Sequence, residues 1–155
     1  MKNFKYLIIT CVVLISVTGC KKYPDDPFIS LKTPQGRLCS GEWTVTSYTI
    51  GGNDSTQAVL DWMSNNRLIF QKGDRDGRNL VTTVNPPYYT DGIWNFSNNK
   101  KEIFLGLHKM TGHNYYVGLF GDGHYYWHIN ELTCKKIKLS QTVNGVEHKL
   151  QFKKN

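Results

Sequence analysis

The side chains capable of acid–base or nucleophilic catalysis are few in this chain of 155 residues, and they do not gather into a known catalytic pattern. There is no Gly-x-Ser-x-Gly nucleophile elbow, no phosphate-binding loop and no His-Glu-x-x-His motif. Many carboxylates stand next to glycine, as Asp74, Asp76 and Asp122 do, where they favour turn formation. We therefore expect a protein that is not an enzyme.

The histidines do not predict a metal site either. His124 and His128 fall on one face of an expected strand, but about 13 Å of strand separates them, which is too far to share one ion. His108 and His113 lie in an expected loop without an acidic or cysteine ligand beside them. His148 falls on the apolar side of its strand and is expected inside the domain. We expect no metal and no cofactor.

Cys20 is the residue whose surroundings predict a specific chemistry. Lys2 and Lys5 precede an uncharged stretch, residues 6–17, that is about 18 Å long as a helix and therefore shorter than a bilayer core of about 30 Å. Val17-Thr18-Gly19-Cys20 follows and resembles the bacterial lipobox, in which an invariant cysteine receives a diacylglyceryl group before cleavage. The resemblance implies a signal peptide over residues 1–19 and a mature chain that starts at an acylated Cys20. The alternative is an ordinary secretory signal with an incidental cysteine.

Residues 20–35 are predicted to be the lipidated N-terminus and a flexible tether. Three prolines interrupt any regular element there, and an extended segment of this length reaches at most about 45 Å from a membrane. Asp25 and Asp26 are similar to the acidic signal that directs Bacteroidota lipoproteins to the outer face of the outer membrane; the alternative is a hydrophilic spacer. We expect a lipid-anchored outer-membrane protein, periplasmic or surface-exposed.

The charge of the chain excludes one class of partner. Removing residues 1–19 takes away Lys2 and Lys5, so the formal net charge falls from +7 to +5. The remaining lysines occur singly or in pairs, whereas a nucleic-acid-binding protein needs a concentrated basic face. We expect a monomer without a nucleic-acid partner, and weak attraction to anionic lipid headgroups or acidic glycans stays an alternative.

Residues 36–155 have the pattern of a single all-β domain. Short runs of alternating apolar residues are separated by Gly, Asn, Asp and Pro, which indicates antiparallel strands. One short helix is predicted after the first strand, at residues 55–64, with Ser55 as its cap. Strands are predicted at residues 42–50, 66–72, 78–85, 91–98, 101–107, 124–131, 135–141 and 146–153.

A family resemblance agrees with this pattern. Gly41-Glu42-Trp43 at the start of the first strand resembles the G-x-W motif of lipocalins. Residues 127–133, followed by Lys136-Ile137-Lys138-Leu139, are similar to the closing strands of lipocalin-like lipoproteins from Bacteroidota. The Thr-Asp-Tyr motif of that family and its arginine after the last strand are missing. The resemblance implies an antiparallel up-and-down β-barrel of about eight strands.

The strand count has one difficulty. Residues 114–120 and 124–132 flank Gly121-Asp122-Gly123 like the two arms of a hairpin, which would make nine strands, whereas a closed antiparallel meander needs an even number. We therefore predict a long loop at residues 108–123, with its own hairpin extension. The longer loops then share one rim, which is expected of a binding barrel with a mouth.

Two functions follow from such a barrel. As the lipocalin resemblance implies, it binds a small apolar or amphipathic ligand inside, through a mouth made by residues 55–64, Tyr88, Tyr89 and residues 108–113. Alternatively, large side chains fill the barrel, and the domain is a protein- or glycan-interaction module on which tyrosine pairs such as Tyr125-Tyr126 stack against sugar rings. The candidate ligand-binding residues are aromatic or aliphatic: Phe70, Tyr88, Tyr89, Trp94, Phe96, Leu105, Trp127 and Leu139.

Two cysteines remain for a disulfide. Cys11 is removed with the signal peptide and Cys20 is acylated, which leaves Cys39 and Cys134 in an oxidising compartment. Cys39 precedes the first strand and Cys134 precedes the seventh, and these strands start at the same rim of an even-stranded meander. A bridge between them is the candidate, and two buried free thiols are the alternative.

Overall fold

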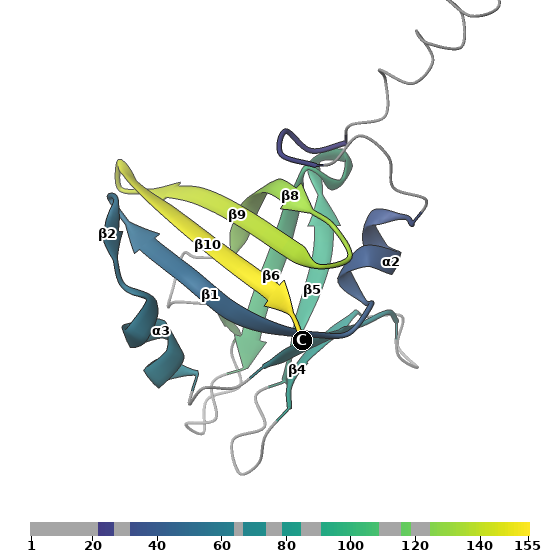
Figure 1. The fold of residues 1–155 in the computed structure, drawn as a ribbon. Helices are drawn as coiled ribbons and strands as arrows, with labels where there is room; N and C mark the ends of the chain where they lie inside the picture. Colours follow the sequence, from purple (N-terminus) through teal and green to yellow (C-terminus); the bar gives the residue numbers. More distant parts are fainter. Residues whose placement is uncertain are drawn as a thin grey trace, which may run out of the picture.

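The structure of this protein is a computed structural model, which describes residues 22–26, 32–63, 67–73, 79–84, 91–108, 116–118 and 125–155. Within these residues the chain folds into a closed antiparallel β-barrel with two short helices (Figure 1). None of the described helices has the length and apolar character that a membrane-spanning helix requires. The barrel confirms the predicted all-β fold.

Eight long strands of the described residues form the wall of the barrel, and each overlaps a predicted strand. Neighbours along the chain pair antiparallel, and the last strand closes the barrel by pairing with the first from Trp43 opposite Lys154 to Ile50 opposite His148. Closure removes the exposed edges that an open sheet would leave. The strands are β1 (Glu42–Ile50), β3 (Leu68–Gln71), β4 (Leu80–Thr83), β5 (Asp91–Ser97), β6 (Glu102–His108), β8 (Tyr126–Leu132), β9 (Lys136–Val143) and β10 (Val146–Lys154).

The sixth position of the barrel is shared by two strands, which resolves the difficulty in the strand count. β7 (Tyr116–Gly118) pairs with the end of β6 through Leu107 and Val117, and β8 pairs with the start of β6 through Ile103 and Trp127. Between them, the amide of Leu105 donates to the carbonyl of Tyr125 over 2.8 Å. β7 and β8 therefore lie end to end along β6. The prediction of a loop over 108–123 is wrong at β7, because these residues continue the ladder along β6.

Two helices of the described residues lie at different ends of β1. α3 (Thr56–Trp62) confirms the predicted helix, and its Val59 belongs to the buried core. Ser55 is the N-cap residue, as predicted, but its side chain makes no capping bond; the amide of Thr56 instead donates to the carboxylate of Asp54 over 2.9 Å. α2 (Pro34–Leu38) precedes β1 and was not predicted. A two-residue strand, β2 (Asn53–Asp54), folds back on the end of β1.

The side chains inside the barrel follow the period of two, with one shift in β1. Trp43 and Val45 face the interior, as predicted, and the register then slips by one residue before Ser47. This bulge leaves Thr46 exposed and turns Tyr48 inward. Without it, Tyr48 would face solvent, because one residue of slip exchanges the two faces of a strand.

Candidate functional site

The candidate ligand-binding residues are the core of the barrel. Trp94 and Trp127 have no exposed surface, and Phe70, Leu105 and Leu139 are at most 2 % exposed. A cavity that held even water would leave the side chains of its wall with surface that water touches. These five side chains are therefore packed in the core with no surface open to water, and their role in ligand binding stays a prediction. Phe96 is partly buried against the same core, and Tyr88 and Tyr89 lie outside the described residues.

Contacts inside the barrel show why these residues leave no room. The ring of Trp94 is packed edge to face with Phe70 at 6.0 Å and with Phe96 at 5.4 Å between ring centroids. Its indole N–H donates to the Gln71 carbonyl over 3.1 Å, and the Trp43 indole donates to the Leu38 carbonyl over 2.8 Å. Because both N–H groups donate to backbone carbonyls, the two indoles are fixed in the core and their polar atoms are already satisfied.

His148 is the interior histidine that the sequence predicts. Its Nδ1 lies 2.6 Å from the hydroxyl of Tyr48, and both side chains are buried. Burial raises the pKa of Tyr48, so its hydroxyl keeps its proton near neutral pH. A buried hydrogen-bonded pair of this kind satisfies polar atoms in a core.

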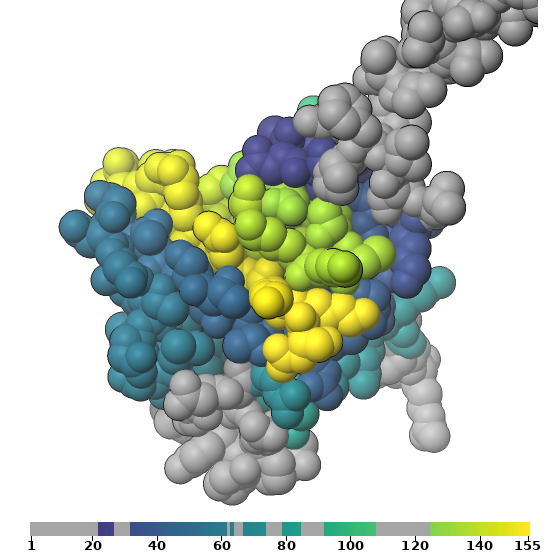
Figure 2. Space-filling model, viewed as in Figure 1, coloured from purple at the N-terminus to yellow at the C-terminus, as the bar shows by residue number. Residues whose placement is uncertain are grey.

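Part of the predicted tether, residues 22–26, is packed against the barrel in the structure. We call residues 22–26 the strap; Figure 2 shows its purple atoms seated against the yellow-green atoms of β8 and β9. Tyr23 is 2 % exposed and belongs to the core cluster. The Asp25 amide donates to the Asn130 carbonyl over 2.9 Å. The prolines of this segment predicted an extended spacer. Removing the apolar ring of Tyr23 from water, however, lowers the free energy of the state in which the segment is packed on the barrel.

Asp26 fixes the strap by a buried ion pair that sequence reasoning missed. Its carboxylate is 2.5 Å from Nη1 of Arg37 in α2 and accepts a 2.8 Å hydrogen bond from the amide of Leu132. The same Arg37 nitrogen donates to the Leu132 carbonyl over 2.7 Å. The strap, α2 and β8 therefore meet at one charged, hydrogen-bonded point. The strap's Asp25 also forms a partly exposed ion pair with Lys138 at 3.0 Å, and the hydrogen bond to Asp25 raises the pKa of Lys138.

The predicted disulfide is not formed, and both cysteines are partly buried free thiols. Burial raises the pKa of the Cys39 thiol, and the nearby charge of Lys72 partly lowers it. Lys72 directly follows β3, which pairs with β1 on the side away from β10. Cys134 lies between β8 and β9, beyond β10. Cys39 lies between α2 and β1, near the charge of Lys72, so the predicted common rim alone does not join the two thiols.

An aromatic cluster on the outer face of the barrel is the described feature best suited to bind a partner. It consists of Phe104, Tyr125 and Tyr126. Phe104 stacks on Tyr125 with 5.7 Å between ring centroids and 7° between planes, and it meets Tyr126 at 5.2 Å and 64°. Tyr126 is 57 % exposed, although aromatic side chains usually lie inside. Phe104 and Tyr126 are opposite each other in the β6–β8 ladder.

A groove of about 320 Å³ runs beside this cluster across β6, β8 and β9. Its polar groups can both donate and accept hydrogen bonds. The carboxylate of Glu102 at one end also accepts from Ser97 and Asn98. Its lining residues are Glu102, Tyr126, His128, Ser140, Gln141, Thr142 and Val143. Sequence reasoning included Tyr126 but missed Phe104, which the outward parity of β6 would have revealed.

Of the remaining histidines, the structure describes only the side chain of His128. His108, His113 and His124 are side chains that the structure does not describe, and His128 lies exposed on the outer face of β8. Among the described residues, no three His, Cys, Asp or Glu side chains gather as a metal site would need. Neither a family model nor a curated protein matches the chain. The geometry of the site is therefore the basis for its function.

Proposed function

We propose that this protein is a lipid-anchored protein of the cell envelope whose filled barrel binds a glycan in the groove beside Tyr126. The observation that carries the proposal is the contrast between the two faces of the barrel. The interior side chains are sealed from solvent, whereas the outer face presents Tyr126 at 57 % exposure. A filled barrel is a rigid scaffold, and its recognition surface must lie on the outside.

The composition of the groove favours a sugar over an apolar ligand. One face of a pyranose ring carries C–H groups that pack on an aromatic ring, and its hydroxyls require donors and acceptors around the edge. Tyr126 offers the ring, while Glu102, His128 and Ser140 offer the polar groups. The groove volume of about 320 Å³ also falls at the lower end of the range for small-ligand sites, about 300–1,000 Å³.

The rigid support of Tyr126 strengthens this proposal. The exposed ring of Tyr126 rests on Phe104, which is itself stacked on Tyr125. An aromatic side chain with two torsions, already held in place, loses little conformational entropy when a ligand stacks on it. The exposed ring is therefore preorganised for a flat ligand face.

Replacing Tyr126 by alanine should weaken glycan binding at least about tenfold, since an aromatic anchor at the centre of a site dominates its affinity. The purified protein is screened on a glycan microarray, and the affinity for the best oligosaccharide is then measured by calorimetry. Val146→Ala is the matched control, because Val146 is also an exposed apolar side chain but lies outside the groove. Binding that survives Tyr126→Ala unchanged, or no binding to any glycan, would contradict the proposed function.

Anchoring is supported by the order of basic region, apolar stretch and lipobox that ends at Cys20. Expression of the full chain in a bacterial host should yield a membrane-bound product whose mature N-terminus is Cys20 and whose intact mass includes acyl chains. Intact mass spectrometry of the membrane fraction measures both. Cys20→Ala should abolish the acyl mass and leave the protein outside the membrane fraction. A wild-type N-terminus at another residue would refute the anchor.

A further inference from the structure

The strap limits how far the barrel can lie from an anchor on Cys20. Two peptide units separate Cys20 from Lys22, and at 3.8 Å between consecutive Cα atoms they span at most about 8 Å. From Tyr23 on, the strap is held to the barrel by burial, by the Asp26–Arg37 ion pair and by the Asp25 amide bond to β8. With Cys20 at a bilayer surface, the face of the barrel around Lys22 must lie beside that bilayer.

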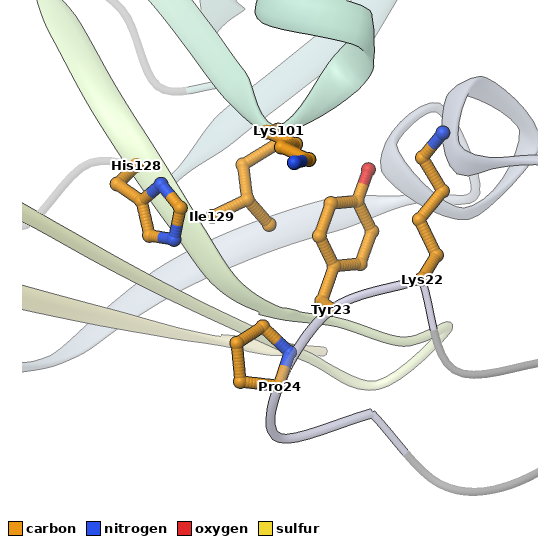
Figure 3. Close-up of a pocket in the computed structure, with 6 residues that line it drawn as sticks. All are labelled: Lys22, Tyr23, Pro24, Lys101, His128 and Ile129. Carbon is orange, nitrogen blue, oxygen red and sulfur yellow. The ribbon is translucent and has the colours of Figure 1, made fainter.

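This face carries positive charge. Lys22 and Lys101 line an open pocket of about 340 Å³ on either side of the Tyr23 ring, together with His128 and Ile129 (Figure 3). Lys100 is next to Lys101 in sequence, and all three lysines are exposed. We call Lys22, Lys100 and Lys101 the basic patch. Figure 3 shows the hydroxyl of Tyr23 between the amino groups of Lys22 and Lys101.

The neighbouring carboxylates do not cancel this charge. Asp26 is paired with Arg37, and Asp25 with Lys138. Glu102 accepts hydrogen bonds from the neutral side chains of Ser97 and Asn98 and keeps its charge, so it offsets at most one of the three lysines. In the part of the chain that the structure describes, no ion pair involves a lysine of the basic patch. The unpaired ammonium groups of Lys22 and Lys101 therefore lie at the point where the chain leaves for Cys20, and Lys100 is the next residue along the chain from Lys101.

We propose that the basic patch rests on an anionic phospholipid surface and, together with the strap, fixes the orientation of the barrel on the membrane. The inference rests on the proposed acylation of Cys20. Headgroup phosphates attract lysines that lie within a Debye length of the bilayer, and the short link to Cys20 keeps all three within this range. The barrel then rests on the bilayer with the face that carries the basic patch.

Lysine acetylation footprinting tests this orientation without any substitution. The acylated protein is reconstituted into vesicles of phosphatidylcholine alone and of phosphatidylcholine mixed with phosphatidylglycerol, and the acetylation rate of each lysine is measured by mass spectrometry. We expect Lys22, Lys100 and Lys101 to react several-fold more slowly on the mixed vesicles, and high salt to remove this difference. Lys72 and Lys153 are the internal controls, because both are exposed and neither lines a pocket that includes a residue of the strap. Equal rates of the basic patch on both vesicles would overturn the proposal.

A charge variant distinguishes electrostatic attraction between the basic patch and the anionic lipid from simple closeness of the barrel to the bilayer. Lys100→Gln combined with Lys101→Gln should abolish the extra protection of Lys22 on the mixed vesicles, whereas Lys72→Gln combined with Lys153→Gln should leave it intact. Protection that persists in the first variant would contradict the basic patch as its cause. These lysines do not line the glycan groove, so glycan affinity in solution is expected to stay unchanged.

The failure of acylation is distinguished from the failure of this inference by intact mass. If the mass shows no acyl chain, the mature chain with Cys39→Ala and Cys134→Ala is coupled through Cys20 to a maleimide lipid in the same vesicles. The same footprint is then expected, because the strap and the basic patch are unchanged. Absence of the footprint in the coupled protein would overturn the orientation proposal whatever happens to Cys20 in the cell.

Discussion

Asp26→Ala should lower the free energy of unfolding by about 3–5 kcal/mol, because it leaves the buried guanidinium of Arg37 without its counter-charge. The side chains of Asp26 and Arg37 are only 3 % and 7 % exposed. The substitution also removes the acceptor of the Leu132 amide, and an unsatisfied buried amide is itself destabilising by about 1–3 kcal/mol. Urea unfolding of the mature protein, followed by tryptophan fluorescence, measures the change.

Two variants of the strap serve as controls. Asp26→Asn keeps an acceptor for the Leu132 amide but removes the charge, so we expect a smaller loss than with alanine. Tyr23→Phe removes a buried hydroxyl that has no hydrogen-bond partner in the structure and retains the packed ring. It should therefore leave stability unchanged or raise it slightly. A loss below about 1 kcal/mol in Asp26→Ala would show that the strap does not dock as described.

Trp127→Ala should cost about 3–5 kcal/mol of stability, since the fully buried indole lies at the centre of a packed core and leaves a cavity. Tyr126→Ala, one residue earlier on the outer face of the same strand, should cost less than about 1 kcal/mol because its ring is exposed. The pair compares the two faces of β8 directly. Denaturant unfolding of both variants measures the difference.

The same variants decide whether the barrel is filled. The unmutated protein should not bind an environment-sensitive apolar dye, and native mass spectrometry should find no lipid inside it. Trp127→Ala creates a cavity and is expected to bind the dye, as engineered apolar cavities bind small apolar molecules. Dye binding by the unmutated protein that fatty acid displaces would contradict the filled barrel and would restore the small-ligand function.

Local alternation was sufficient to predict the wall of this barrel. Apolar residues at every second position place Phe70, Trp94 and Trp127 inside, because successive side chains of a strand point to opposite faces whatever the rest of the chain does. The turn at Asn144 and Gly145 is also local, since both residues adopt positive φ there. The predicted helix depended on residues within one segment as well.

Contacts between distant residues were decided only by the tertiary structure. The ion pair and hydrogen bonds that dock the strap join Asp26 to Leu132, 106 positions away, and nothing near Asp26 in the sequence distinguishes it from a residue of a solvated spacer. The cysteines show the same limit, because a rim that their strands share does not determine whether the two thiols come within bonding distance.

The candidate site depended on both levels. The outward parity of Phe104 and of Tyr126 follows from alternation within each strand. Their contact does not, because it requires the register in which β6 and β8 pair, and that register is set by bonds between strands that are far apart in the sequence. Whether a barrel is hollow or filled is likewise set by how the volumes of its inward side chains fit the closed wall, which only the packed structure determines.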